Sequence, residues 1–207
     1  MNKIFFCSVY CCCTVFFNGC TNLWMEDLVG HLIPNNYKDE YNIGGIGPGG
    51  GRVFYCDPTG FVMIDTGEIC HYLEAAPNNV PASTSGLFWA SIPMENFFMQ
   101  TETYIGAGRY NTAFILDKDP DAPAAKACKD YNGGGKNDWF LPSLDELYKI
   151  LENKEIIDDL TGGFTNNFWS SSQHPAADNL AWFVSFFGDL DAASKPNGYY
   201  VRPIRAF

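Results

Sequence analysis

A helix with a sharply marked start stands between two groups of strand-like segments, and this order limits the folds open to the chain. Ser143 and Glu146 have the S-x-x-E spacing of a capping box, in which each side chain accepts a hydrogen bond from a backbone N–H at the start of the helix. Apolar residues then recur at helical spacing, at Leu144, Leu147, Tyr148 and Leu151. The pattern predicts an amphipathic helix that ends near residue 154.

Short runs of aromatic and β-branched residues, separated by turn residues, lie on both sides of this helix. The runs at 52–56 and 70–76 predict a β-hairpin, and those at 166–173, 180–189 and 198–207 predict three further strands. Pro203 is expected at a sheet edge or bulge, because it cannot donate a hydrogen bond to the ladder. A second short helix is predicted at 123–130, after a loop-rich segment at 77–121. We therefore expect a compact α+β domain with an antiparallel sheet and two short helices.

The N-terminus resembles the signal peptide of a bacterial lipoprotein. Residues 4–17 form an apolar run that is too short to span a bilayer and suits a signal-peptide core. The run leads to Gly19 and Cys20, as in a lipobox, where Cys20 would be lipidated after cleavage. Phe17 and Asn18 depart from the usual lipobox residues in the manner of the looser boxes of spirochetes; ordinary secretory cleavage is the alternative.

This resemblance sets the expected organisation of the chain. We expect a signal peptide at 1–19, a tether at 20–40 and a folded domain at 41–207, anchored by lipid in the cell envelope, at the outer membrane or the cell surface. Cysteines 7, 11, 12 and 13 leave with the signal, and three remain in an oxidising compartment. Cys56 and Cys70 are predicted to form a disulfide across the hairpin. Cys128 is then the odd thiol, packed on the apolar face of a short helix.

The charge of the chain argues against polyanionic partners. The chain has 13 basic and 24 acidic residues, and removing residues 1–19 removes only Lys3, which leaves a formal charge of −12. Nucleic acid, heparin-like glycans and anionic lipid headgroups are repelled by such a field. The arginines are scattered in sequence, although Arg109, Arg202 and Arg205 could converge in the fold.

Several motifs that imitate catalytic or binding sites have simpler explanations. Gly45, Gly47 and Gly50 have G-x-G-x-x-G spacing, but a polar segment precedes them and a strand follows, so a turn is expected and not a nucleotide site. The serines at 170–172 lie near His174 without a nucleophile elbow, and small strand residues satisfied by hydrogen bonds are expected. The acidic run at 117–121 lacks the glycine and glutamate of a calcium loop. The histidines, at 31, 71 and 174, have no metal-ligand spacing, so no metal and no cofactor are expected.

The order of the longer motifs resembles the Lcl C-terminal domain family. These motifs are "GGIGPGGGRVFYCD", "YLEAAP", "AAKACKDYNGGGKNDWFLPSLDELYKIL", "FWSSS", "LAWFVSF" and "VRPIRAF", and together they cover roughly residues 43–207. The resemblance implies a compact α+β fold related to C-type lectin-like and formylglycine-generating-enzyme-like domains, in a secreted or surface protein. Some family members lie at the tips of adhesins that bind host glycosaminoglycans. The signature residues, expected to be structural, are Asp138, Trp139, Leu141, Pro142, Trp169, Ser170, Ser171, Trp182, Arg202 and Arg205.

The aromatic residues of the loop-rich segment are the candidates for ligand binding, because binding residues concentrate on loops. They are Phe88, Trp89, Phe97, Phe98 and Tyr104, with Arg109 beside them. Trp139, Trp169 and Trp182 are expected in the core. We expect a non-catalytic surface or periplasmic lipoprotein whose domain binds a neutral glycan or a protein. A structural envelope component and an enzyme related to formylglycine-generating oxidases are the alternatives; the enzyme would need paired reactive cysteines near a cleft.

Overall fold

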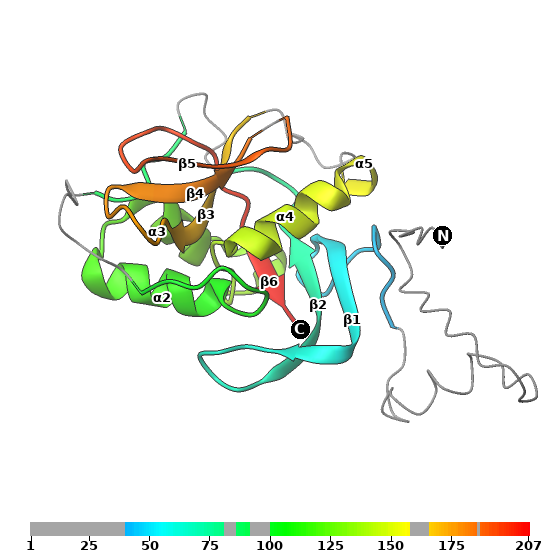
Figure 1. Cartoon of the computed structure of the whole chain (residues 1–207). Coiled ribbons are helices and arrows are strands. Elements are labelled where there is room, and N and C mark those ends of the chain that lie inside the picture. Colours follow the sequence, from blue (N-terminus) through cyan, green and yellow to red (C-terminus); the bar gives the residue numbers. More distant parts are fainter. Residues whose placement is uncertain (1–39, 81–85, 92–99, 158–165, 186) are drawn as a thin grey trace, which may run out of the picture. The chain divides into compact units, whose positions relative to one another are not determined.

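The computed structural model describes residues 40–80, 86–91, 100–157, 166–185 and 187–207 (Figure 1). The chain divides into one unit at 1–35 and another at 36–207, and every described residue belongs to the second. The predicted signal peptide, the tether with Cys20 and His31, and the candidates Phe97 and Phe98 lie outside the described residues. Within the described ranges, no helix has both the length and the apolar character needed to cross a membrane.

The described residues form an α+β domain, as predicted, but with two antiparallel sheets where the sequence analysis expected one. The first sheet has the order β1-β2-β6, with β1 at Arg52–Val62, β2 at Ile69–Ala75 and β6 at Ile204–Ala206. The second has the order β3-β4-β5, with β3 at Phe168–Gln173, β4 at Leu180–Val184 and β5 at Leu190–Ser194. Pro203 directly precedes β6, an edge strand, as its missing N–H requires.

Both predicted helices are confirmed. Helix α4 covers Leu144–Glu152, and its capping box is complete, because the Ser143 side chain accepts from the N–H of Glu146 while the Glu146 side chain accepts from the N–H of Ser143. Helix α3 covers Pro123–Lys129, with Pro123 in the first turn and Cys128 on the buried face. A four-residue helix, α5 at Lys154–Ile157, follows α4. A 3-10 turn, η1 at Gly133–Gly135, follows α3.

Helix α2, at Gly108–Lys118, was not predicted. It lies in the segment expected to be loop-rich, and its buried residues are Gly108, Asn111, Thr112 and Ile115. These positions have the i, i+3, i+4, i+7 spacing of a helix face, but Ile115 is the one large apolar side chain among them. A hydrophobic period therefore could not reveal the helix.

The hairpin of β1 and β2 is confirmed, but its register is not the one that the predicted disulfide required. Tyr72 lies opposite Cys56, and Phe61 lies opposite Cys70. Between these pairs β1 advances five residues while β2 moves two, so residues 57–60 bulge out of β1 where a turn was expected. Cys70 is a buried free thiol, and the Cys56–Cys70 disulfide is not formed.

Two apolar clusters fill the domain. One lies between the first sheet and α4, and includes Phe54, Leu73, Leu147 and Ile204. The other gathers Trp89, Ile115, Trp169 and the alanines of α3 under the second sheet. Strand β5 was also not predicted, because its sequence LDAAS has few β-formers; it exists through its ladder with β4, from Leu180↔Ser194 to Val184↔Leu190.

Candidate functional site

The glycine-rich loop before β1 binds a carboxylate of the same chain. The N–H of Gly49 donates to Oε1 and Oε2 of Glu74 at 2.8 and 3.1 Å, and the N–H of Gly51 donates to Oε2 at 3.0 Å. Glu74 is completely buried. A Cβ on Gly49 would come within 2.7 Å of both Glu74 Oε1 and the Trp139 ring, so the close approach requires glycine. As predicted, the loop is a turn leading into a strand, and its N–H groups serve Glu74.

The arginines that could have formed a basic face each have a partner within the fold. Arg205 pairs with Glu74 at 3.1 Å and with Asp138 at 2.6 Å. Arg202 is buried and donates to the carbonyl of Ala76 at 2.8 Å. Arg109 pairs with Asp65 and Glu68 near the tip of the β1–β2 hairpin. Each of these three side chains is therefore engaged with groups of the same domain.

The three serines of β3 connect four parts of the domain. Ser170 Oγ donates to the Trp182 carbonyl in β4, and Ser171 Oγ accepts from Nδ2 of Asn111 in α2. Ser172 Oγ donates to the carbonyl of Glu102 at 2.7 Å and accepts from the N–H of Leu144 at 3.1 Å. The motif is thus explained by hydrogen bonding within the fold, as the sequence analysis expected.

The other signature residues also have structural contacts. The Trp139 indole donates to the Gly133 carbonyl at 3.1 Å, and the Trp169 indole donates to the Leu87 carbonyl at 2.9 Å. Both rings are buried, as is Leu141. The Pro142 carbonyl accepts from the N–H of Ser171 at 2.7 Å, which joins the start of α4 to β3.

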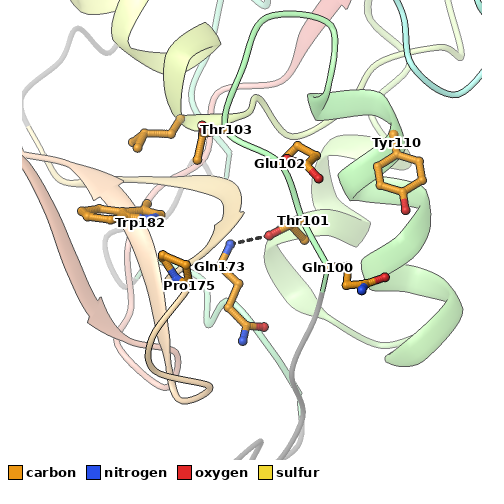
Figure 2. A pocket seen from close by; sticks show the side chains of 9 residues that line it. Gln100, Thr101, Glu102, Thr103, Tyr110, Gln173, Pro175 and Trp182 are labelled. Carbon is orange, nitrogen blue, oxygen red and sulfur yellow. Dashed lines mark hydrogen bonds between the residues drawn. The ribbon is translucent and has the colours of Figure 1, made fainter.

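An open pocket of about 540 Å³ lies beside β3, between elements that these serines connect (Figure 2). Its polar lining comes from the segment before α2 and from the end of β3: Gln100, Thr101, Glu102, Thr103 and Gln173. Its aromatic and apolar lining comes from α2, α4, the turn after β3, and β4: Tyr110, Leu144, Pro175 and Trp182. In Figure 2, Trp182 and Tyr110 lie on opposite sides of the view, with residues 100–103 running between them.

The polar wall of the pocket is held by hydrogen bonds that use its backbone. Asn111 accepts from the N–H of Glu102 at 2.9 Å and donates to its carbonyl at 2.7 Å. Thr101 Oγ1 accepts from the N–H of Gln173 at 2.7 Å, and the Thr103 carbonyl accepts from the N–H of Asp145. The segment is therefore fixed before any ligand arrives, while the side chain of Glu102 stays exposed.

Trp182 lies at this pocket and not in the core. It is half-buried on β4, and its ring centroid is 4.9 Å from that of His174. The expectation of a core position was wrong because residues alternate along β4, where Ala181 and Phe183 take the buried face. Nδ1 of His174 accepts from the N–H of Ala176 at 3.2 Å.

The loop aromatics Phe88, Trp89 and Tyr104, which the structure describes, are not among the residues that line the pocket. Phe88 and Tyr104 are exposed, at 54% and 44%, but Trp89 is completely buried and its indole donates to the Ser170 carbonyl at 2.8 Å. The choice of Trp89 as a ligand-binding candidate was therefore wrong, because its side chain belongs to the core. The guanidinium group of Arg109 forms ion pairs with Asp65 and Glu68. The polar lining and Tyr110 were not predicted from the sequence. The only local signal for the polar lining was the position of Gln173 at the end of the serine run.

Burial shifts the pKa of several groups near these elements. Burial lowers the pKa of Lys195 to about 8, against the raising effect of Asp178 and Asp119; its Nζ lies 3.1 Å from Gln173 Oε1 and 4.6 Å from the centre of the Trp89 ring. Burial raises the pKa of Glu146 to about 7, although the hydrogen bonds it accepts oppose the shift. Burial also raises the pKa of Cys70 to about 11 and that of Cys128 well above its usual value.

Metal ligation is not favoured where the acidic run lies. Asp119 is buried and accepts from the N–H and hydroxyl of Ser91, while Asp117 pairs with Lys118. Across the described ranges, no group of three or more histidine, cysteine, aspartate or glutamate residues has the geometry to hold a metal ion.

Comparison with known proteins identifies the family. A search of curated proteins gives no match. The family model described as the Lcl C-terminal domain matches residues 78–205, more than half of the chain. The match includes α2, α3, α4, the second sheet and the nine described residues that line the pocket, and it begins after the glycine-rich loop and the hairpin. The chain therefore belongs to the Lcl C-terminal domain family.

Proposed function

We propose that this chain is a non-catalytic lipoprotein of the bacterial envelope whose folded domain binds a neutral glycan or a protein at the pocket beside Trp182. Cys20 would carry the lipid and residues 21–40 would separate the domain from the membrane. The ligand would come from the envelope or from a host surface. The fold relationship we propose is to C-type lectin-like and formylglycine-generating-enzyme-like domains, in keeping with the family.

The observation that carries this proposal is the pocket, which combines two aromatic side chains with a polar wall. Binding sites are typically concave, preformed and lined by apolar or aromatic groups with a few well-placed polar ones. Trp182 and Tyr110 supply the aromatic groups, and Glu102 and Gln173 supply polar ones. The hydrogen bonds of Asn111 to the backbone of Glu102 fix the wall, which lowers the entropy cost of binding.

Charge favours an uncharged or cationic ligand. Among the lining residues that the structure describes, Glu102 alone carries a full charge, and the whole chain has a formal charge of −11. Arg109, Arg202 and Arg205 are engaged with carboxylates or a carbonyl. A sulfated polysaccharide needs several neutralising contacts, and these arginines do not provide them together.

A binding array tests the proposal. The full chain in detergent micelles is applied to immobilised neutral glycans, heparin, and envelope and extracellular-matrix proteins. We expect binding to a neutral glycan or a protein that Trp182→Ala removes, and that survives Phe88→Ala, a change in an exposed aromatic residue outside the pocket. Heparin should not retain the chain at physiological salt. Absence of binding to every spot, or binding that Trp182→Ala leaves intact, would contradict the proposal.

A further inference from the structure

Several backbone N–H and carbonyl groups around the pocket already form hydrogen bonds within the domain, which disfavours an extended peptide as the ligand. The N–H and carbonyl of Glu102 are both bonded to Asn111, and the carbonyl also accepts from Ser172. Along the outer edge of β3, the N–H of Ser171 donates to the Pro142 carbonyl and that of Gln173 donates to Thr101. Peptides that add to a sheet edge need such groups unoccupied. Recognition at this pocket therefore depends on side chains.

The side chains of the pocket suit a ligand that has apolar ring faces and many hydroxyl groups. Trp182 is a half-buried indole with area for stacking, and Thr103 and Leu144 line the same pocket. Glu102 has two carboxylate oxygens that can each accept a hydrogen bond from a hydroxyl group, and hydrogen bonds to an ionised acceptor are stronger than neutral ones. A sugar ring offers a C–H face and adjacent hydroxyls together.

The arrangement of the two aromatic residues favours more than one sugar ring. Figure 2 shows Glu102 and Tyr110 on one side of the 100–103 segment and Trp182 on the other. The pocket, of about 540 Å³, includes both sides. Tyr110 is itself supported by Phe114, whose ring centroid is 5.9 Å away.

We propose that this pocket binds two consecutive residues of a neutral oligosaccharide, one ring stacked on Trp182 and the other hydrogen-bonded to Glu102 beside Tyr110. The inference rests on the proposed function and specifies its ligand. It places an uncharged chain of sugars, and neither a sulfated glycan nor an extended peptide, at this site.

Calorimetric titration of the full chain in detergent micelles tests it. The neutral probes are diacetylchitobiose, cellobiose, maltose and lactose with their monosaccharides, and the cationic probes are glucosamine and trilysine. At least one neutral disaccharide should bind more tightly than its monosaccharide. Its affinity should fall at least tenfold in Trp182→Ala and in Glu102→Gln. It should stay within about threefold in Trp182→Phe, which keeps a stacking face, and in Phe88→Ala.

The outcomes separate the ligand class from the function. No binding of a neutral sugar at millimolar concentration, equal affinity for monosaccharide and disaccharide, or an affinity unchanged by both pocket variants would each overturn the inference. If only trilysine binds, and Trp182→Ala removes that binding, the inference is overturned while the proposed function stands, because a basic peptide represents a protein ligand. If only glucosamine binds, both are overturned, because a cationic sugar is neither a neutral glycan nor a protein. Circular dichroism and urea unfolding of each variant establish that a lost affinity does not come from lost structure.

Discussion

Several residues whose sequence pattern suggests ligand binding instead form hydrogen bonds and ion pairs with groups of the same domain. The glycine-rich loop has the spacing of a phosphate-binding motif, yet its N–H groups bond the buried carboxylate of Glu74. Arg205, near the C-terminus, completes the environment of that carboxylate and also pairs with Asp138. Three distant segments are thus joined by charged groups, of which Glu74 is completely buried and Arg205 is 12% exposed.

Replacing Arg205 should destabilise the domain more than replacing Arg109, whose side chain is 23% exposed. Arg205→Met leaves the buried Glu74 carboxylate without its cation, and breaking a buried ion pair in this way costs about 3 kcal/mol or more. Arg109→Met is the matched control, with an expected cost below about 1 kcal/mol, because its ion pairs lie at the surface. Urea unfolding measures both, and equal losses would contradict this account of Glu74.

Glu146 should make stability depend on pH. Its pKa is about 7 in the folded domain because of burial, above the ordinary value of 4.5, so the folded state holds the proton more tightly. The free energy of unfolding should therefore fall as pH rises between about 4.5 and 7, by up to roughly 3 kcal/mol. Glu146→Gln, which does not titrate, should lower stability and flatten this dependence. Urea unfolding at pH 5 and pH 7.5 compares the two slopes; parallel slopes would contradict the assignment.

The elements that could be predicted from the sequence are those whose stability comes from local signals. Helix α4 has both a capping box and an apolar period, and the hairpin of β1 and β2 has β-forming runs. Helix α2 and strand β5 have neither, since α2 buries glycine, asparagine and threonine, and β5 depends on its pairing with β4. The bulge in β1 changed the cysteine register that the disulfide prediction assumed.

The pocket could not be predicted for the same reason. Its wall at 100–103 has no secondary structure of its own and is positioned by Asn111 on an unpredicted helix and by Ser172 on β3. Trp182 could be found by its residue type, but its exposure depends on which face of β4 the rest of the domain covers. The serine run marked a hydrogen-bonded strand correctly without showing which segment it holds.

Ser172 on β3 should contribute more to stability than Ser194 on β5, the other edge strand of the same sheet. Ser172→Ala removes the partner of the Leu144 N–H, in a buried contact, and one of the partners of the Glu102 carbonyl, in a part-buried contact. Leaving a buried donor unsatisfied costs about 1–3 kcal/mol. Ser194→Ala on β5 is the control, with an expected change below about 1 kcal/mol. Chemical denaturation of the two variants decides this, and a loss no larger than that of the control would contradict it.

In the whole molecule, the folded part belongs to the Lcl C-terminal domain family, and the lipid anchor at the N-terminus is a proposal. Polyanionic ligands are disfavoured because the composition is acidic and because Arg109, Arg202 and Arg205 are engaged within the fold. The preformed pocket favours an uncharged ligand. Lipidation at the N-terminus and ligand binding at the pocket are independent properties, and they can be measured separately.

Lipidation should depend on Cys20. In a bacterial host fed an alkyne-bearing fatty acid, we expect the chain to be labelled and to fractionate with membranes, because a small residue followed by cysteine closes the apolar run. Cys20→Ala should lose the label, and Cys128→Ser, at a buried thiol of α3, should retain it. A wild-type chain that stays unlabelled and free of the membrane fraction would contradict the anchor.

The indole N–H signals in a ¹H–¹⁵N spectrum show whether a ligand binds at the Trp182 pocket. The indoles of Trp89, Trp139 and Trp169 donate to the carbonyls of Ser170, Gly133 and Leu87 inside the domain, whereas Trp182 lines the pocket. On titration with the tightest-binding neutral disaccharide, the Trp182 signal, assigned by its loss in Trp182→Phe, should move progressively while those three stay in place. A saturable binding isotherm with an unmoved Trp182 signal would contradict the account.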